Sequence, residues 1–251
     1  MTNNRIKELV ALKDKAKARR ETATYMVEGI KMCGEAPADK VLETYVTQGF
    51  KKQHEQWLKG RNYEVVDDKV FNRISDTMTP QGVLSVLKQP QFSLDDLIKS
   101  EAGLYMILED IQDPGNLGTI IRTAEGAGVT AVIMSRGCVD IYNPKTIRST
   151  MGSVYRVPFV YVDDLAYVTS KMKKNGITIY AAHLKGKRLY DEVNYKKTAF
   201  LIGNEGNGLK DETAALADEY IKIPMAGKVE SLNAAVAASI LMYEYGRSMR
   251  C

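Results

Sequence analysis

The stretch TAFLIGNEGNGL, residues 198–209, joins an apolar run to a loop that carries three glycines within six residues. A short apolar run that is followed by glycine predicts a β-strand covered on both faces. Glycines directly after such a strand permit positive φ angles and let a ligand approach the backbone closely. The stretch therefore predicts a buried strand that ends at a binding loop. An ordinary glycine-rich connection between a strand and a helix is the plainer alternative.

The alternation of apolar runs and amphipathic segments extends on both sides of this stretch. Further strands are predicted at 104–108, 131–134, 157–162, 177–181 and 220–223, and helices at 117–127, 144–151, 164–174, 209–217 and 232–247. Strands that alternate with helices predict a parallel sheet whose ligand sites lie in the loops after the strands. We therefore expect an α/β domain over residues 103–251.

The first part of the chain predicts a second, smaller α/β unit. A basic helix over residues 1–20 precedes predicted strands at 25–27, 41–46, 63–66 and 82–87, with helices from Ile30, at 51–58 and at 67–74. The pattern lapses over residues 88–93, where Pro90 interrupts it. We place the boundary in this region and expect the first domain over residues 1–95.

The composition is that of an ordinary globular chain. It has 251 residues, of which 45% are hydrophobic and 26% are charged, and its formal net charge is +4. No apolar run is long enough to span a bilayer, and the N-terminus lacks the apolar segment of a secretory signal. Cys33, Cys138 and Cys251 are scattered and have no metal-ligand spacing. We therefore expect reduced thiols, a cytoplasmic location, no metal site and no membrane association.

Positive charge is concentrated at the N-terminus. Residues 1–20 contain seven basic side chains against two acidic ones, and Arg19 and Arg20 close the run. Such a segment can lie along phosphates and release their counterions. The simpler interpretation is a solvated helix face that docks through Ile6, Leu9 and Val10.

A second loop, after the predicted strand at 104–108, carries polar residues at the start of a helix. Pro114 and Gly115 turn the chain, Asn116 stands where a helix cap is expected, and Arg122 follows in the second turn. A guanidinium suits a phosphate or a carboxylate. The alternative is that Asn116 is only a cap and Arg122 only a surface ion-pair partner.

A third loop follows the predicted strand at 220–223. It reads IPMAGKVESLN over residues 223–233, and Ser231 is a natural helix cap before a run of small residues. Small residues allow another backbone to pack closely, so a capped helix in a tight core is the simplest interpretation. In the glycine-rich loop, by contrast, Glu205 is unusual for a plain turn. We expect it to pair with a cationic group or to accept hydrogen bonds from hydroxyls.

Together and in this order, the three loops resemble those of the SpoU (TrmH) family of RNA ribose methyltransferases, within the SPOUT superfamily. The motifs are NxGxxxRTA at residues 116–124, IGNEGxGL at 202–209 and IPMxGxxESLNxxxA at 223–237. Residues 1 to about 90 more loosely resemble the substrate-binding domain that often precedes this catalytic domain and is like a small ribosomal RNA-binding protein. That resemblance is carried by EG at 28–29 and SDTxxPQGV at 75–83.

The resemblance implies a fold, a cofactor and an assembly. The C-terminal segment would thread through a loop to form a deep trefoil knot. The catalytic domain would form a homodimer with the active site completed across the interface. S-adenosylmethionine would sit bent among the loops after Ile202 and Ile223. The residues implied to hold this cofactor are Leu201, Ile202, Gly203, Asn204, Gly206, Ile223, Met225, Gly227, Ser231, Leu232 and Asn233.

The resemblance also implies methyl transfer to a ribose 2′-hydroxyl of structured RNA, with ribosomal RNA favoured. Arg122 is the leading catalytic candidate, and its implied companions are Asn116, Glu205, Ser231 and Asn233. Because arginine loses a proton only at great cost, we expect Arg122 to hold a phosphate and stabilise the developing alkoxide. Glu205 is a candidate for orienting Arg122.

Other basic residues are candidates for holding the RNA. The candidate contacts to its phosphates are Arg19, Arg20, Lys145 and Arg148. The two histidines, His54 and His183, are expected to be structural or surface residues.

Three other functions fit parts of the pattern. A transfer RNA ribose methyltransferase would carry the same motifs. A silent RNA-binding protein of ribosome assembly predicts erosion of Arg122, Glu205 or residues 231–233, and all are present. An oxidoreductase on a doubly wound sheet requires a glycine fingerprint after its first strand, which is missing.

Overall fold

The computed structural model describes residues 1–100 and 102–250, which form two compact units. The first unit contains Met1–Gln91 together with Asp140–Tyr155, and the second contains residues 92–139 and 156–250. The chain therefore passes between the units three times. The sequence places residues 140–155 in the second domain, whereas the structure packs them in the first unit. Cys251, which ends the expected second domain, lies outside the described residues.

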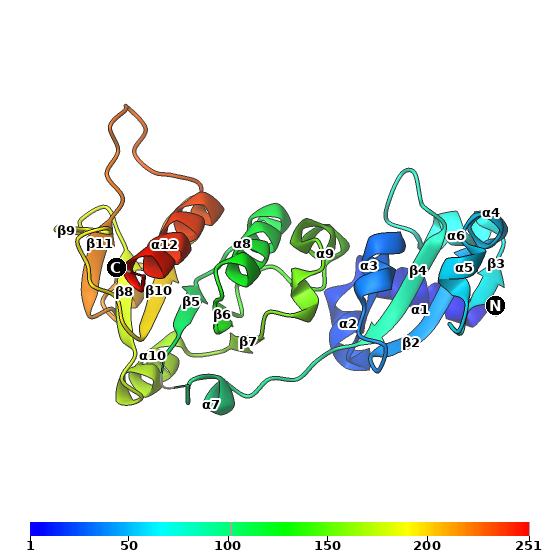
Figure 1. Cartoon of the computed structure of the whole chain (residues 1–251), viewed down its shortest axis with the longest axis horizontal. Coiled ribbons are helices and arrows are strands. Elements are labelled where there is room, and N and C mark those ends of the chain that lie inside the picture. The colour runs from blue at the N-terminus through cyan, green and yellow to red at the C-terminus, as the bar shows by residue number, and fades with distance from the viewer. Residues whose placement is uncertain (101, 251) are drawn as a thin grey trace. The chain divides into compact units, whose positions relative to one another are not determined.

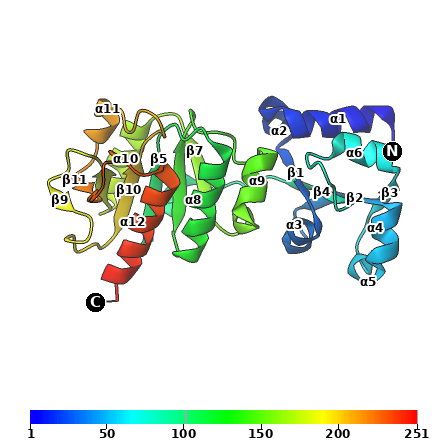
Figure 2. The ribbon, with the colours of Figure 1, turned by 90° about the horizontal axis from the view of Figure 1, so that it is seen from above.

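The first unit is built on a mixed sheet of four described strands in the order β1-β4-β2-β3. β1 and β2 run antiparallel to β4, and β3 runs parallel to β2. Helices α1 and α6 cover one face, and α3 and α4 cover the other (Figure 2). The elements are β1 (Thr24–Glu28), β2 (Val41–Thr47), β3 (Glu64–Val66), β4 (Val83–Lys88), α1 (Asn3–Asp14), α2 (Ala16–Thr22), α3 (Ile30–Glu35), α4 (Gln48–Gln53), α5 (Glu55–Leu58), α6 (Asp68–Ile74), α9 (Pro144–Thr150) and the 3-10 helix η1 (Ser153–Tyr155).

The core of the first unit lies between the sheet and the pair α1 and α6. Leu9, Phe71 and Ile74 are fully buried there against strand residues such as Leu84. The expected helix over residues 1–20 is wrong in one respect, because extended backbone at Lys15 divides it into α1 and α2. The expected helix at 51–58 is likewise divided, at His54, into α4 and α5.

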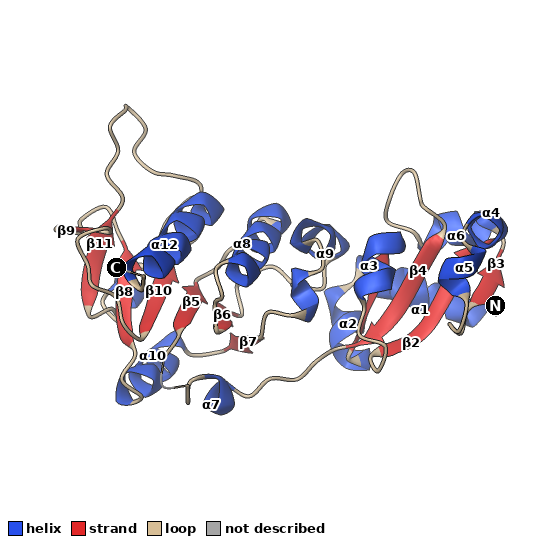
Figure 3. Cartoon of the chain, in the orientation of Figure 1, coloured by secondary structure: helices blue, strands red, loops and turns tan. Residues whose placement is uncertain are grey.

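The second unit is a parallel α/β fold, as the sequence predicts. Seven described strands lie in the order β7-β6-β5-β10-β8-β11-β9, and all their pairings are parallel. Figure 3 shows the helices that cover this sheet. The elements are β5 (Leu104–Leu108), β6 (Ala131–Ser135), β7 (Phe159–Val162), β8 (Thr178–Ala182), β9 (Arg188–Leu189), β10 (Thr198–Ile202), β11 (Glu219–Lys222), α7 (Leu94–Leu97), α8 (Pro114–Gly126), α10 (Leu165–Lys174), α11 (Asp211–Ala214) and α12 (Ala234–Ser248).

Helices pack on both faces of this sheet. α8 and α12 lie side by side on one face, and α10 lies on the other (Figure 1). Every residue of β5 and β10 is buried, because alternate side chains enter the two cores that these helices close. Tyr105 and Ile107 of β5, for example, are buried in the same core as Met172 of α10.

Three details of the second unit differ from the sequence prediction. The helix expected at 209–217 is only the short α11, and neither α7 nor β9 was expected. The trefoil knot remains a prediction from the family resemblance. Because β5, β10, β8 and β11 are neighbours and parallel, the loops after them gather at one edge of the sheet. Within the described residues, no helix is both long and apolar enough to cross a bilayer.

Candidate active site

A cavity of about 490 Å³ lies where β8, β10 and β11 end. The glycine-rich loop forms one wall and the loop from β11 to α12 forms another. The cavity is therefore built from the second and third sequence motifs, which lie far apart in the chain. Its lining comprises residues 182–185, 202–209, 211, 221–223, 225, 230–232, 234 and 237.

The glycine-rich loop is a compact turn that only glycine permits at its start. A Cβ on Gly203 would lie 2.2 Å from the backbone carbon of Gly208. The backbones of Asn204 and Gly208 exchange two hydrogen bonds, of 3.0 and 2.9 Å, and Gly208 has a φ of +68°. The Asn204 side chain accepts hydrogen bonds from the N–H groups of Gly206 and Asn207 and donates to the Asp110 carbonyl. The loop is thus fixed internally and anchored to the end of β5.

Glu205 projects from this turn toward the start of α8. Its carboxylate accepts hydrogen bonds from the backbone N–H groups of Gln112 (3.1 Å) and Asp113 (3.0 Å) and from the Asn116 side chain (3.0 Å). Burial raises the pKa of this carboxyl, but the hydrogen bonds together outweigh burial and hold the pKa below its usual value. The expectation that Glu205 pairs with a cation or with hydroxyls is wrong, because amide donors already occupy it. Nor does Glu205 contact Arg122.

The third motif is joined to the same network. The Asn233 side chain donates a 2.9 Å hydrogen bond to Oδ1 of Asn116, whose Nδ2 donates to Glu205. One residue from each of the three motifs therefore belongs to a single chain of hydrogen bonds. Three of the expected catalytic companions, Asn116, Glu205 and Asn233, are in contact.

Two expected helix caps are wrong. Asp113, not Asn116, caps α8, since its carboxylate accepts from the N–H of Asn116. Asn233, not Ser231, caps α12, since its side chain accepts from the N–H groups of Ala235 and Val236. Both true caps directly precede the first helical residue, where a side-chain acceptor reaches the unpaired N–H groups of the first turn. Ser231 instead lines the cavity.

Most residues implied to hold the cofactor line this cavity. They are Ile202, Gly203, Asn204, Gly206, Ile223, Met225, Ser231 and Leu232. The Leu201 side chain is fully buried in the core below the cavity and does not reach it. Gly227 lies in the exposed loop between β11 and α12, and Asn233, which is also exposed, belongs to the hydrogen-bonded chain rather than to the lining.

Arg122 lies apart from the cavity. It is in the third turn of α8, not the second, because the helix begins at Pro114. Its side chain is exposed, and it has no hydrogen bond or ion pair to any residue of the described chain. The alternative in which Arg122 is a surface ion-pair partner therefore does not hold.

Several cavity residues were missed from the sequence. His183, Leu184 and Lys185 line it after β8, where His183, expected to be a structural or surface residue, forms part of the wall. Their one sequence signal was their position directly after a predicted strand. Asp110 was also missed. It has a φ of +52°, bonds Ser135 and Lys210, and joins the ends of β5 and β6 below the glycine-rich loop.

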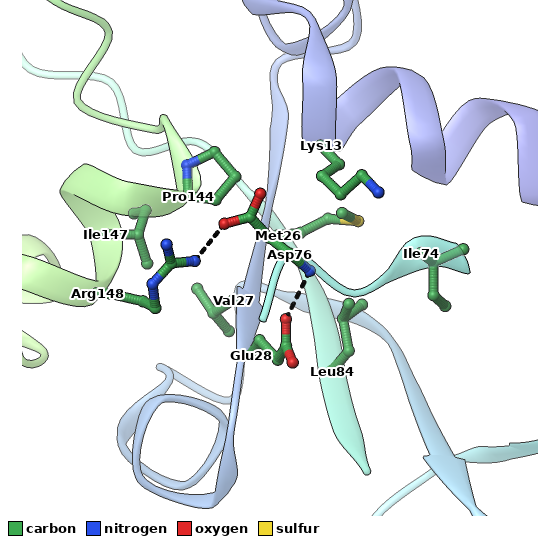
Figure 4. A pocket seen from close by; sticks show the side chains of 10 residues that line it. All are labelled: Lys13, Met26, Val27, Glu28, Ile74, Asp76, Leu84, Pro144, Ile147 and Arg148. Carbon is green, nitrogen blue, oxygen red and sulfur yellow. Dashed lines mark hydrogen bonds and ion pairs between the residues drawn. The ribbon is translucent and has the colours of Figure 1, made fainter. Parts of the chain in front are cut away.

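The four expected RNA contacts of the first unit fall into different environments. Arg19 is buried and bonds Oδ2 of Asp140 at 2.7 Å, so its assignment to RNA is wrong. Arg20 and Lys145 are exposed. Arg148 is half-exposed and forms an ion pair with Asp76 beside a small hollow (Figure 4). The described residues include no cluster of three or more histidine, cysteine, aspartate or glutamate side chains that could hold a metal ion.

Family models match most of the chain. The SpoU rRNA Methylase family matches residues 103–243, and the MRM3-like substrate binding domain matches residues 3–85. The first match contains all three loop motifs, and the second contains most of the four-stranded sheet.

Known proteins are similar over nearly the whole chain. The 23S rRNA (guanosine(2553)-2′-O)-methyltransferase RlmP of Bacillus subtilis is 32% identical over 96% of this chain and 95% of its own length. An AdoMet-bound rRNA methyltransferase from Sinorhizobium meliloti is 33% identical, with a TM-score of 0.86 over 98% of this chain and 95% of that one. The SpoU methyltransferase AviRb from Streptomyces viridochromogenes, in complex with AdoMet, is 26% identical with a TM-score of 0.89 over 99% of both chains.

Proposed function

Since the chain belongs to the SpoU rRNA methylase family, we propose that it transfers a methyl group from S-adenosylmethionine to a ribose 2′-hydroxyl of ribosomal RNA. The observation that carries the proposal is the chain of hydrogen bonds through Asn233, Asn116 and Glu205. It joins the three loop motifs at the edge of the sheet where the cavity opens. A silent RNA-binding protein has no need of such a cavity with its loops fixed in this way.

The cavity fits the cofactor in size and chemistry. Its volume of about 490 Å³ lies in the range of small-molecule sites. The turn contributes three glycines without side chains to the lining, Gly203, Gly206 and Gly208, while Ile223, Met225 and Leu232 supply apolar surface. We assign the adenosine and methionine parts to these loops. When bound, the cofactor supplies an electrophilic methyl group on a sulfonium, and the chain has to align the acceptor oxygen with it.

We assign the stabilisation of the ribose oxygen to Arg122. A guanidinium remains charged throughout the reaction and can bond both a phosphate and a developing alkoxide. Because Arg122 lies apart from the cavity of its own chain, we propose that it completes the cavity of a second copy in a homodimer. In support, α12 beside it exposes Val236 and Tyr243, which are 47% and 57% accessible. Exposed apolar side chains on one helix are typical of a surface that is covered in an assembly.

Mixing two inactive variants tests the shared site. We combine Arg122→Ala with Gly203→Ala, which damages the cavity, and allow the subunits to exchange. In each mixed dimer one site has an intact arginine and an intact cavity, so activity returns to about a quarter of wild type. An arginine that serves its own chain's cavity predicts no recovery. If analytical ultracentrifugation shows that the protein is a monomer at the concentration of the assay, the proposed homodimer is contradicted.

The proposed function is tested with purified protein, labelled S-adenosylmethionine and separate pools of ribosomal and transfer RNA. We expect label in ribosomal RNA, at a ribose, and none after Arg122→Ala, although that variant keeps its thermal stabilisation by the cofactor. Label in transfer RNA alone would select the transfer RNA enzyme. Stabilisation without transfer to either pool would favour the non-catalytic protein. With ribosomal RNA as substrate, the cytoplasm is the proposed location.

A further inference from the structure

The loop over residues 75–82, between α6 and β4, is held at its base by one carboxylate. Glu28, at the end of β1, accepts hydrogen bonds from the hydroxyls of Ser75 (2.7 Å) and Thr77 (2.6 Å) and from the N–H of Asp76 (3.0 Å). Figure 4 shows Glu28 bonded to Asp76 in this way. The start of the loop is therefore fixed to the sheet. We call residues 75–82 the Met78 loop.

The other end of the Met78 loop is fixed as well. The Gln81 side chain accepts a 2.8 Å hydrogen bond from the N–H of Ile30. Its oxygen lies so close to Gly29 that a Cβ there would be 2.9 Å away, and Gly29 has a φ of +93°. Pro80 further restricts the backbone beside Gln81. The loop is thus ordered before any partner binds, which lowers the entropy cost of binding.

Between these anchors Met78 points into solvent. Its accessibility is 100%, the highest of the exposed large hydrophobic side chains, where the next is Leu184 at 66%. A methionine side chain is apolar, unbranched and polarizable, so it adapts to flat surfaces of varied shape. Covering this side chain with a partner removes its apolar surface from water, which is favourable.

Three cationic side chains, Lys13, Arg73 and Arg148, lie at the foot of the loop, where Lys13 is also 4.0 Å from Asp14. Lys13 donates to the carbonyls of Arg73 and Ser75, and Arg148 pairs with Asp76 (Figure 4). Arg73 is exposed at the end of α6, with no ion pair to any described residue. The acidic groups here, Glu28, Asp76 and Asp14, all have partners within the chain. Of the three cations at the foot of the loop, Arg73 is therefore the one that is left to bind an anionic group such as a phosphate.

We propose that the Met78 loop binds an unpaired nucleotide of the substrate RNA, with Met78 against the face of its base and the nearby cations beside the flanking phosphates. The inference rests on the proposed function, because it takes RNA as the substrate. Residues 3–85, which match the substrate-binding domain, include the whole loop. Stacked duplex RNA exposes no base faces, whereas loops and bulges do. The loop thus selects RNA with an unstacked base.

The test compares two RNA hairpins that share one stem, of which one carries a single-nucleotide bulge. We measure Kd for the full chain, for Met78→Ala and Met78→Leu, and for Leu42→Ala, which removes another exposed apolar side chain of the same unit, 54% accessible. We expect wild type to prefer the bulged hairpin. Met78→Ala loses about tenfold in affinity for it, or about 1.4 kcal/mol, and Met78→Leu keeps most of that affinity.

Two further readouts separate a base contact from a charge contact or a fold defect. Because no charge is removed, the slope of log K against log salt is unchanged in Met78→Ala. Its Tm and its Kd for S-adenosylmethionine are also unchanged, while KM for ribosomal RNA rises and kcat does not. Equal losses on the paired and bulged hairpins, a wild type without preference, or an equal effect of Leu42→Ala would each overturn the proposal. A chain that prefers bulged RNA through Met78 but transfers no methyl group would refute the proposed function alone.

Discussion

Replacement of Arg19 by alanine should destabilise the first unit, whereas replacement of its neighbour Arg20 should not. Arg19 is 3% accessible, and its guanidinium donates to Oδ2 of Asp140 (2.7 Å) and to the carbonyls of Leu12 (2.7 Å) and Lys13 (2.9 Å). It therefore ends α1 and at the same time ties residues 140–155 to the unit. Alanine leaves all three acceptors without this donor.

The expected loss follows from that burial. Removing one partner of a buried ion pair costs about 3–5 kcal/mol, because the remaining charge and carbonyls lose their compensation. The Asp140 side chain is 19% accessible, so water relieves little of the cost. For a unit of about a hundred residues, even the lower figure corresponds to a fall of more than about 10 °C in Tm.

Scanning calorimetry of the full-length variants measures this effect. Arg20→Ala is the matched control, and we expect its free energy of unfolding to stay within about 0.5 kcal/mol of wild type. If Arg20 contacts a phosphate, Arg20→Ala makes the slope of log K against log salt for RNA binding less steep by about one. A structural role of Arg19 is refuted if Arg19→Ala melts like wild type and loses RNA affinity instead, since Arg19 would then be an RNA contact.

Three further outcomes follow from the catalytic unit. Gly203→Ala places a Cβ against the backbone of Gly208, so we expect the Kd for S-adenosylmethionine to rise more than about tenfold in titration calorimetry. The control is Gly246→Ala, whose Cβ meets only the far end of an arginine side chain, and we expect it to leave that Kd unchanged. Glu205→Gln replaces one carboxylate oxygen by an amide donor that faces the backbone N–H groups of Gln112 and Asp113. We therefore expect cofactor affinity to fall in titrations and kcat to fall in rate assays. Kinetics equal to those of wild type would contradict the role of Glu205 as an anchor. The hydrogen bond from Lys210 holds the pKa of Asp110 below its usual 3.8, so the stability that this carboxylate contributes is complete above the unfolded pKa and is lost as the pH falls through the lowered folded one. Acid unfolding below about pH 4 should therefore be less steep in Asp110→Asn, and identical acid profiles would show that the pair contributes nothing.

The architecture of the second unit was predictable because parallel strands buried on both faces are apolar without interruption. The runs at 104–108 and 198–202 both became fully buried strands. Their order places the following loops at one edge, so the convergence of Glu205 and residues 231–232 at one cavity also followed from the pattern. The alternation of strands and helices predicted ligand sites in the loops after the strands, and the family resemblance indicated which two loops hold the cofactor.

The sequence could not show which of two neighbouring residues of similar chemistry takes a given structural role. Ser231 and Asn233 can both cap a helix, and the decision depends on which residue precedes the first helical dihedral angles. At α8 a signal existed, since Asp113 stands before Pro114, and proline favours the first helical position. Residue type does not distinguish Arg19 from Arg20, because the contacts that make Arg19 interior, with the carbonyls at the end of α1 and with the distant Asp140, exist only in the folded chain.

Helix α8 gives the three motifs and the arginine a common frame. Asn116 in its first turn donates a hydrogen bond to Glu205 and accepts one from Asn233, so both loops that line the cavity are anchored to this one helix. Arg122 lies six residues further along the same helix, a rise of about 9 Å. A rigid helix keeps that separation constant, so the loops of this chain's cavity and the arginine proposed to serve the second copy's cavity hold a fixed spacing. In the proposed homodimer each site therefore depends on the α8 helices of both copies, because the rate of methyl transfer depends on the approach of the acceptor oxygen to the methyl carbon.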